Sequence, residues 1–462
     1  MTSSYVAAAF ESLGEIIDKF ITVEGFGDCF SRDTLNNFFL QTCDKFLHSF
    51  GQSFAGRKKY DKYAEQEAKL FKKNRDYGFF NSCIFMVDSG AFQISTGLLD
   101  RRETDILHKV YYDDFLVNYT DVFDRAFVLD IPPGPGCSVF SSFDDVYKLN
   151  YESYIKASEL PDHVREKIVY IHHFRTPKLW DIYTRIMDEN DLFDKFKWFS
   201  TGGIVANMAS DTAIPCIIYV LPLIPLIVRA KKYGRKKLYF HILGGAQYRD
   251  VFFYELFKIH VLKVHGIELE ITYDSSGIFK GLMIGRTLPI MLDGKLTRLD
   301  LRTSALDGKH IGAIDDRKTI EIYRDTLKEL CKFGFKDINM KEVYSQETGT
   351  FLYDVRSYSM LHMLYIYAKV QSYLKEVAID LYKLFEAGDQ ENLVLFNKKI
   401  SEVTRNMNEG KVTKKQISKS NSVITSLDML TKLDEEFCHY IVEKFLSKDE
   451  FTTLSSNKDL LF

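Results

Sequence analysis

The sequence predicts an α/β protein built on a (β/α)8 TIM-like barrel, with helical regions added at both ends of the chain. Three observations favour this fold. From residue 82, short apolar runs bounded by Gly, Pro or Ser alternate with longer amphipathic runs. Strand and helix in repeated order predict a parallel sheet covered by helices. Six or more such units suit a barrel better than a small open sheet. A doubly wound sheet is the alternative, although no GxGxxG follows the first strand.

The chain divides into three predicted regions. Residues 1–81 form an N-terminal helical region, because apolar residues recur at helical spacing in 5–20 and 34–50. Residues 82–314 are expected to form the barrel. Its strands are expected within six apolar runs, and amphipathic helices lie between them. The six runs are 83–90, 126–134, 166–174, 195–203, 236–245 and 267–275.

A hairpin and a second helical region follow the last of these strands. Alternating runs on both sides of Asp293-Gly294 predict the hairpin. Residues 315–462 are expected to be helical, with helices over 319–334, 357–388 and 430–447 and an exposed basic loop over 408–422.

Composition excludes several classes of protein. Of 462 residues, 46% are hydrophobic and 27% charged, which excludes a disordered chain. The seven cysteines form no CxxC pair, so we expect reduced thiols, a cytoplasmic location and no metal. The apolar run 213–228 is short and holds three prolines, which favours a buried helix or helix pair over a membrane span. A net charge of -3 limits any nucleic-acid surface to a local patch.

Three predicted strands end in an aspartate: Asp88, Asp130 and Asp274. In a (β/α) barrel, reactive side chains lie at this end of the strands. A single aspartate here often caps a turn, but three in equivalent positions favour a working site. Two other strands end in paired glycines, which allow close approach of a planar ligand or simply form tight turns. These pairs are Gly202-Gly203 and Gly244-Gly245.

The ordered motifs resemble those of the tRNA-guanine transglycosylases. DSGAFQ at 88–93 resembles the family's DSGGFQ, and LDIPP at 129–133 resembles its second aspartate motif. STGGIVA and HILGGAQ resemble its glycine motifs, and ITYDSS falls where the family has its nucleophilic aspartate. The resemblance covers roughly 82–286. DSGAFQ is fairly specific, and the ordered set is more specific than any single motif.

The departures from the family indicate a divergent branch. Its zinc site, a CxCxxC with a later His, is absent, so no cofactor or metal is expected. The pattern resembles the DNA-guanine transglycosylases of bacterial and bacteriophage 7-deazaguanine DNA modification (the DpdA family). Nine prolines and abundant Lys, Ile, Asn, Phe and Tyr suggest an AT-rich, viral genome. The resemblance implies a pentosyltransferase that exchanges guanine in DNA for a free 7-deazaguanine base, 7-cyano-7-deazaguanine (preQ0) being favoured.

The resemblance also assigns roles to residues. Asp274 would be the nucleophile that forms a covalent aspartyl-nucleotide intermediate, and Asp88 the general acid/base. The remaining predicted residues would bind the base: Asp130 at its N1-H and 2-amino edge, Gly202 and Gly203 through their backbone, Phe92 and Leu243 on the ring faces, and Ser89, Gln93 and His172 as lesser contacts, with His173 as the alternative to His172.

A nucleic-acid substrate needs contacts to its phosphates and a flipped target base. Lys280 and Arg286, soon after Asp274, are the predicted phosphate contacts. The basic clusters 57–59, 72–75 and 229–237 each precede a predicted strand, which places them at the opposite end of the barrel. Duplex DNA would also call for a partner protein that opens it. The alternatives are tRNA as substrate, a non-catalytic nucleic-acid-binding transglycosylase subunit, and an unrelated nucleoside hydrolase.

Overall fold

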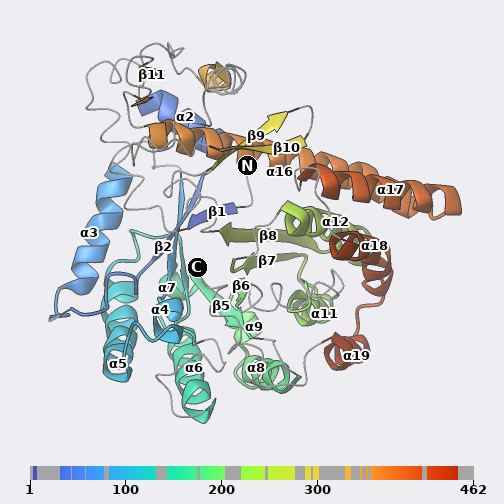
Figure 1. Cartoon of the computed structure of the whole chain (residues 1–462). Helices are drawn as coiled ribbons and strands as arrows, with labels where there is room; N and C mark the ends of the chain where they lie inside the picture. The colour runs from blue at the N-terminus through green and yellow to red at the C-terminus, as the bar shows by residue number, and fades with distance from the viewer. Residues whose placement is uncertain are drawn as a thin grey trace.

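The structure is a computed structural model of the whole chain (Figure 1). The residues that it describes are 4–7, 32–42, 44–57, 59–76, 83–131, 143–173, 177–202, 220–244, 248–275, 287–292, 295–300, 328–333, 344–345, 350–351, 355–407 and 414–445.

An all-parallel, curled sheet forms the centre of the molecule. Each strand pairs with the next in the order β1 to β8, and β1 also pairs with β8. The predicted α/β fold with a parallel sheet is confirmed, and the arrangement is compatible with a TIM-like fold. The strands are β1 (Ser4–Ala7), β2 (Lys45–Ser49), β3 (Ile84–Asp88), β4 (Arg125–Phe127), β5 (Ile168–His172), β6 (Trp198–Thr201), β7 (Lys237–Ile242) and β8 (Glu268–Ser275).

Helices lie between consecutive strands and surround the sheet (Figure 1). α8 shows why, since its buried residues recur at three- and four-residue spacing and form one apolar face. These helices are α2 (Arg32–Thr42), α3 (Tyr63–Asp76), α4 (Ala91–Ser95), α5 (Arg101–Lys109), the π-helix η1 (Val110–Leu116), α6 (Phe143–Ser158), α7 (Asp162–Arg165), α8 (Pro177–Glu189), α9 (Leu192–Lys195), α11 (Leu223–Tyr233) and α12 (Tyr248–His265).

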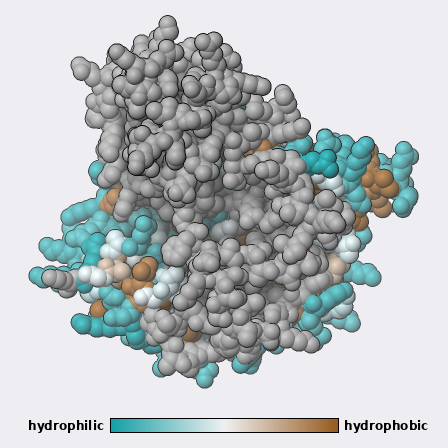
Figure 2. Space-filling view, in the orientation of Figure 1, coloured by the Kyte–Doolittle hydropathy of each residue, from teal (hydrophilic) through white to brown (hydrophobic). Residues whose placement is uncertain are grey.

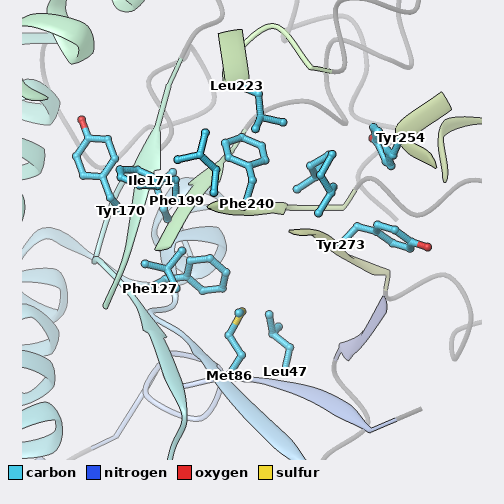
Figure 3. Packing of buried hydrophobic residues seen from close by; sticks show 14 of the residues in the cluster. Leu47, Met86, Phe127, Tyr170, Ile171, Phe199, Leu223, Phe240, Tyr254 and Tyr273 are labelled. Carbon is cyan, nitrogen blue, oxygen red and sulfur yellow. The ribbon is translucent and has the colours of Figure 1, made fainter. Parts of the chain in front are cut away.

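Successive residues of each strand point to opposite faces of the curled sheet: one toward its interior, the next toward the surrounding helices. Leu47, Met86 and Phe127, from β2, β3 and β4, point into the space between the strands (Figure 3). Tyr170 points the other way, and its ring lies 4.9 Å from that of Tyr154 on α6. This alternation decides which strand-end side chains enter the site.

Two strands lie in the N-terminal region that the sequence predicted to be helical. β1 and β2 belong to the parallel sheet, so the helical prediction was wrong at these residues. The helix expected over 34–50 ends at Thr42, and β2 follows after it. The cause is the short apolar run in DKFLHSF, whose periodicity does not separate a strand from a buried helix.

The apolar run over 213–228 contributes α11, whose residues Leu223 to Ile227 are buried. Residues 213–219 of that run lie outside the described part of the chain. Within the described residues, no helix is both long enough and apolar enough to cross a membrane.

The predicted hairpin is present as β9 (Thr287–Leu292) and β10 (Lys295–Asp300), which pair antiparallel with Leu292 opposite Lys295. The exposed loop expected over 408–422 was partly wrong, because α18 begins at Lys414. Of the helix expected over 319–334, the structure describes the 3-10 turn η4 (Glu329–Phe333). The other C-terminal elements are β11 (Tyr344–Ser345), β12 (Thr350–Phe351), α16 (Val355–Ala387), α17 (Gln390–Met407), α18 (Lys414–Met429) and α19 (Glu435–Phe445).

The C-terminal helices pack against the helices around the sheet. The Tyr382 hydroxyl on α16 lies 3.2 Å from Nδ1 of His260 on α12. His265 Nε2 lies 2.9 Å from the Leu430 carbonyl oxygen, and Lys231 Nζ donates to the Leu433 carbonyl at 2.8 Å. These contacts anchor the end of the described chain to α11 and α12.

Candidate active site

Three aspartates from three strand ends come together. Asp88 is the last residue of β3, Asp274 is the penultimate residue of β8, and Asp130 follows β4 by three residues. The negative charges of Asp130 and Asp274 both raise the pKa of Asp88. Asp88 therefore lies within electrostatic reach of both other aspartates, at one end of the parallel sheet.

Among the carboxyl groups of the described residues, Asp88 shows the clearest change in acidity. Burial raises its pKa to about 6, and the charges of Asp130 and Asp274 act in the same direction. Hydrogen bonds from the Ser49 hydroxyl and the Gly90 N–H partly offset this rise. A carboxyl group with this pKa can both donate and accept a proton near neutral pH.

The loops after β2 and β3 hold Asp88 in place. The N–H of Phe50 donates to the Asp88 carbonyl at 2.7 Å. Gly51 and Gly90 lie against each other, because a Cβ built on Gly51 would be 2.7 Å from the Gly90 Cα. Gly90 also has a φ of 101°, which L-residues with side chains rarely adopt. Glycine is needed at both positions for this close approach.

Asp130 is buried, and the backbone on both sides of it is hydrogen-bonded. Its Oδ2 is 2.8 Å from Nε2 of His173, and the two side chains are only 3% and 4% exposed. The contact has the distance of an ion pair, but the ring nitrogen is not aligned as a hydrogen-bond donor. The flanking residues are fixed as well: the Leu129 N–H donates to the Tyr112 hydroxyl at 2.9 Å, and Asn150 bonds both the N–H and the carbonyl of Ile131.

Asp274 accepts two hydrogen bonds on one oxygen. The Gly244 N–H donates to its Oδ1 at 2.6 Å, and His241 Nε2 lies 3.3 Å from the same atom. On the other side of the ring, His241 Nδ1 is 3.0 Å from the Thr272 hydroxyl. The Gly244 N–H, which could have faced a ligand, is thus directed at Asp274.

Several predicted base-binding residues surround these aspartates. Gln93 accepts a hydrogen bond from Ser49 at 3.3 Å. Ser89 is fully buried, and its hydroxyl has no hydrogen-bond partner among the described residues. Leu243 is half-buried in the turn after β7. Gly202 faces His173, whose Cε1 would be 3.3 Å from a Cβ at that position. Gly202 therefore makes room for the histidine.

His172 does not face the aspartates. Its ring lies 5.4 Å from that of Trp180 and 6.4 Å from that of Tyr183, both on α8. His172 shares the outward face of β5 with Tyr170, and His173 approaches Asp130. The assignment of His172 to the base site is therefore corrected in favour of His173.

Four predicted residues cannot be placed in the site. Gly203, Lys280 and Arg286 lie outside the described residues. Phe92 belongs to α4, but its side chain is also outside the described part.

The basic clusters divide between the two ends of the sheet. Arg57 and Lys59 follow β2, so they lie at the end that carries the aspartates, which corrects the sequence-based placement of this cluster. The missed strand β2 caused that error. The cluster 229–237 leads into β7, at the end of the sheet that was predicted, and two of its charges are paired at short distance: Arg229 with Asp188 at 2.6 Å, and Lys237 with Glu268 at 3.0 Å.

Sequence reasoning missed Ser49, His241 and Asn150. Asn150 had no signal, because a single asparagine within a helical pattern is unremarkable. His241 had a signal in the sequence, because it lies two residues before Leu243 in the predicted strand 236–245 and so on the same predicted face. Ser49 could not be found without β2.

Among the described residues, no group of three or more His, Cys, Asp or Glu side chains could hold a metal ion. Comparisons of the chain with protein-family models, with curated proteins and with solved structures find no match.

Proposed function

We propose that this chain is a guanine transglycosylase that exchanges guanine in DNA for 7-cyano-7-deazaguanine through a covalent aspartyl-nucleotide intermediate. One observation carries the proposal: Asp88, whose pKa is raised to about 6, lies within electrostatic reach of Asp274 and Asp130. Exchange of a base at a glycosidic bond needs one carboxylate as nucleophile and one carboxyl group that exchanges protons with the bases. Asp274 and Asp88 suit these two roles.

In the proposed reaction, Asp274 attacks C1′ while the bond from C1′ to the guanine ring nitrogen breaks. The electron pair of that bond leaves with guanine, which takes a proton from Asp88. The incoming base then attacks C1′, releases Asp274 and returns a proton to Asp88. A group with a pKa near 6 can serve in both steps at neutral pH.

Asp130 would select the base. A carboxylate offers about four acceptor sites, and His173 contacts one oxygen, so the other remains suited to the N1-H and 2-amino group of guanine. The hydrogen bonds of the Leu129 and Ile131 backbone fix the segment that carries this carboxylate. A rigid acceptor discriminates against bases that lack these donors.

We propose that the fold is a TIM-like (β/α)8 barrel, because the ligands of such barrels bind at the carboxyl ends of the strands, where the three aspartates lie.

The reaction would take place in the cytoplasm, which is that of the host if the chain is viral. Exposed Lys59 and Lys62, in the loop after β2, lie at the same end as Asp88 and are suited to backbone phosphates. Opening of a duplex is assigned to a partner protein.

Incorporation of labelled 7-cyano-7-deazaguanine tests the proposal. The purified protein is offered duplex DNA, single-stranded DNA and tRNA in parallel, with Asp274→Ala as the inactive variant. We expect label in DNA with the wild type and none with Asp274→Ala, while the variant still binds DNA. Label in tRNA alone would assign the chain to tRNA modification. Release of guanine without incorporation would indicate a hydrolase, and label in no nucleic acid, even single-stranded, would contradict the proposal.

A further inference from the structure

His241 occupies a position that the proposed reaction does not yet use. It is 2% exposed, on the inward face of β7, and its ring lies 5.3 Å from that of Phe127. Its two nitrogens contact two residues of β8, Thr272 and Asp274. Because Thr272 is the register partner of His241 and Asp274 follows two residues later, both side chains share its face.

The partners of the ring determine which nitrogen carries the proton. An ionised carboxylate only accepts hydrogen bonds, so Nε2 must donate to Asp274 Oδ1. In a neutral ring, Nδ1 then accepts from the Thr272 hydroxyl at 3.0 Å. The Phe240 carbonyl is a weaker competitor for this hydroxyl, at 3.5 Å. Thr272 therefore orients the ring and selects its Nε2–H form.

We propose that His241 is a positioning residue, which together with Gly244 binds Oδ1 of Asp274 so that Oδ2 is the atom that attacks the sugar. Both donors fall on Oδ1, at 3.3 Å and 2.6 Å. An oxygen that accepts two hydrogen bonds has its lone pairs engaged, which leaves the other oxygen as the better nucleophile.

The consequence differs between the two half-reactions, and this part rests on the proposed function. When Asp274 attacks, the C1′–Oδ2 bond forms, and Oδ1 becomes the carbonyl oxygen of the ester. When the incoming base attacks, that bond breaks, and its electron pair returns to the carboxylate. The two donors stabilise the restored negative charge, so they favour discharge of the intermediate over its formation.

The test separates the two half-reactions in three proteins: wild type, His241→Phe and His241→Gln. Single-stranded DNA without free base gives the denaturation-stable adduct, and 7-cyano-7-deazaguanine is then added to discharge it. With His241→Phe we expect discharge about tenfold slower and adduct formation changed by less than about threefold. With His241→Gln, which retains a donor, we expect a discharge rate within about threefold of wild type. Equal slowing of both steps, or no slowing by a folded His241→Phe, would overturn the proposal.

A second measurement does not depend on activity. Ring ¹⁵N spectra of histidine-labelled protein, with the His241 signal assigned by its loss in His241→Phe, report which nitrogen is protonated. We expect the Nε2–H form in the wild type, and a shift toward the Nδ1–H form in Thr272→Val, which lacks the hydroxyl donor. An Nδ1–H form in the wild type would overturn the proposed role. If the wild type forms no adduct, the proposed function fails, and the spectra still decide the hydrogen bond to Asp274.

Discussion

At Asp88, the features that suit it to proton transfer oppose stability. Its folded pKa of about 6 exceeds the value of about 3.9 that an unfolded aspartate has. Between these values the folded protein binds more protons than the unfolded chain, so this residue's contribution to stability falls as pH rises from about 4 to about 6. Above pH 6 the buried, ionised Asp88 lowers the free energy of unfolding.

Replacement of Asp88 should therefore stabilise the protein while it greatly slows exchange. We expect Asp88→Asn to raise the free energy of unfolding by about 1–3 kcal/mol at pH 8 and to change it little at pH 4. Urea unfolding at the two pH values measures this difference. Asp114→Asn, at an exposed aspartate of η1, is the control and should show no such pH dependence. A loss of stability at pH 8 would contradict the assigned environment.

The proton-transfer role predicts a pH profile for the first half-reaction. In the proposed reaction guanine would depart with a proton from Asp88, so adduct formation should slow as pH rises above about 6, where Asp88 loses that proton. Single-turnover guanine release between pH 5 and 8 measures the profile. In Asp88→Asn we expect a rate that is much lower and does not follow this profile. An unchanged profile in that variant would assign the proton to another group.

The contact between Gly51 and Gly90 provides a steric test of how the loops after β2 and β3 hold Asp88 in place. Gly51→Ala places a Cβ 2.7 Å from the Gly90 Cα, so the loops after β2 and β3 must separate. We expect a loss of about 1–3 kcal/mol in stability and a large loss of exchange activity. Gly56→Ala is the matched control, because Gly56 has a φ of 72° and open space around it.

Gly56→Ala should cost about 1–2 kcal/mol through backbone strain alone and should retain activity. Urea unfolding and the incorporation assay compare the two variants. Full exchange activity in Gly51→Ala would show that the contact between the loops does not position Asp88.

At the scale of elements, the loops after β2 and β3 form one surface beside the site. The Gly56 N–H and the Tyr60 hydroxyl both donate to Glu103 of α5, each at 3.1 Å. These bonds hold the loop that carries Lys59 and Lys62 against α5. Figure 2 shows hydrophilic side chains along the outer edge of the molecule over α3 and α5. In the proposed reaction, Lys59 and Lys62 on this surface would contact the nucleic-acid backbone near Asp88.

Salt dependence of DNA binding tests that surface. Each lost phosphate contact should reduce the slope of log affinity against log salt by about 0.9 on duplex DNA. We expect a reduction of this size for Lys59→Ala and for Lys62→Ala. Lys236→Ala, at an exposed lysine before β7 at the other end of the sheet, should leave the slope unchanged. Equal effects of all three would indicate a diffuse electrostatic attraction.

Whether an element could be predicted depended on the length of its sequence pattern and on the residues that bound it. Strands β3 to β8 were predictable, because Gly, Pro or Ser bounds each run and long helical patterns separate them. β1 and β2 were not, because each directly adjoins apolar residues at helical spacing. α18 was missed, because its first residues are polar and basic and resemble an exposed loop.

The site residues, too, were predictable only where the sequence pattern marked their position. The three aspartates were predictable from their place at strand ends, because parallel strands bring their carboxyl ends together. The choice between His172 and His173 was not, because it depends on where β5 ends and which face meets α8. The hydrogen bonds to Asp274 come from β7 and the turn after it, and sequence spacing alone does not give that register.

At the scale of the whole molecule, buried histidines should make the fold sensitive to acid. Burial lowers the pKa of His172 to about 3 and those of His108 and His260 to about 4. The unfolded chain takes up these protons below about pH 6.5, and the folded protein does not. The stability that they confer is complete above that pH and is lost as pH falls, opposite in sign to the effect of Asp88.

His172 gives the clearest test of this acid sensitivity, because neither of its ring nitrogens has a hydrogen-bond partner among the described residues that would stabilise the protonated ring. The free energy of unfolding should fall between pH 6.5 and 5, by up to about 1.4 kcal/mol per pH unit for each such histidine. His172→Phe should reduce this slope and keep the fold, whereas His163→Phe, at an exposed histidine, should not reduce it. Urea unfolding across this pH range decides. An unchanged slope in His172→Phe would mean that the ring is protonated in the folded protein.

The identity of the residue that carries the sugar tests the central claim most directly. Protein incubated with single-stranded DNA in the absence of free base is denatured, digested and analysed by mass spectrometry. We expect a nucleotide lacking its guanine to be attached to the peptide that contains Asp274, and discharge by 7-cyano-7-deazaguanine to remove it. Attachment at another residue, or incorporation of the base with no adduct formed, would contradict the assignment of Asp274 as nucleophile.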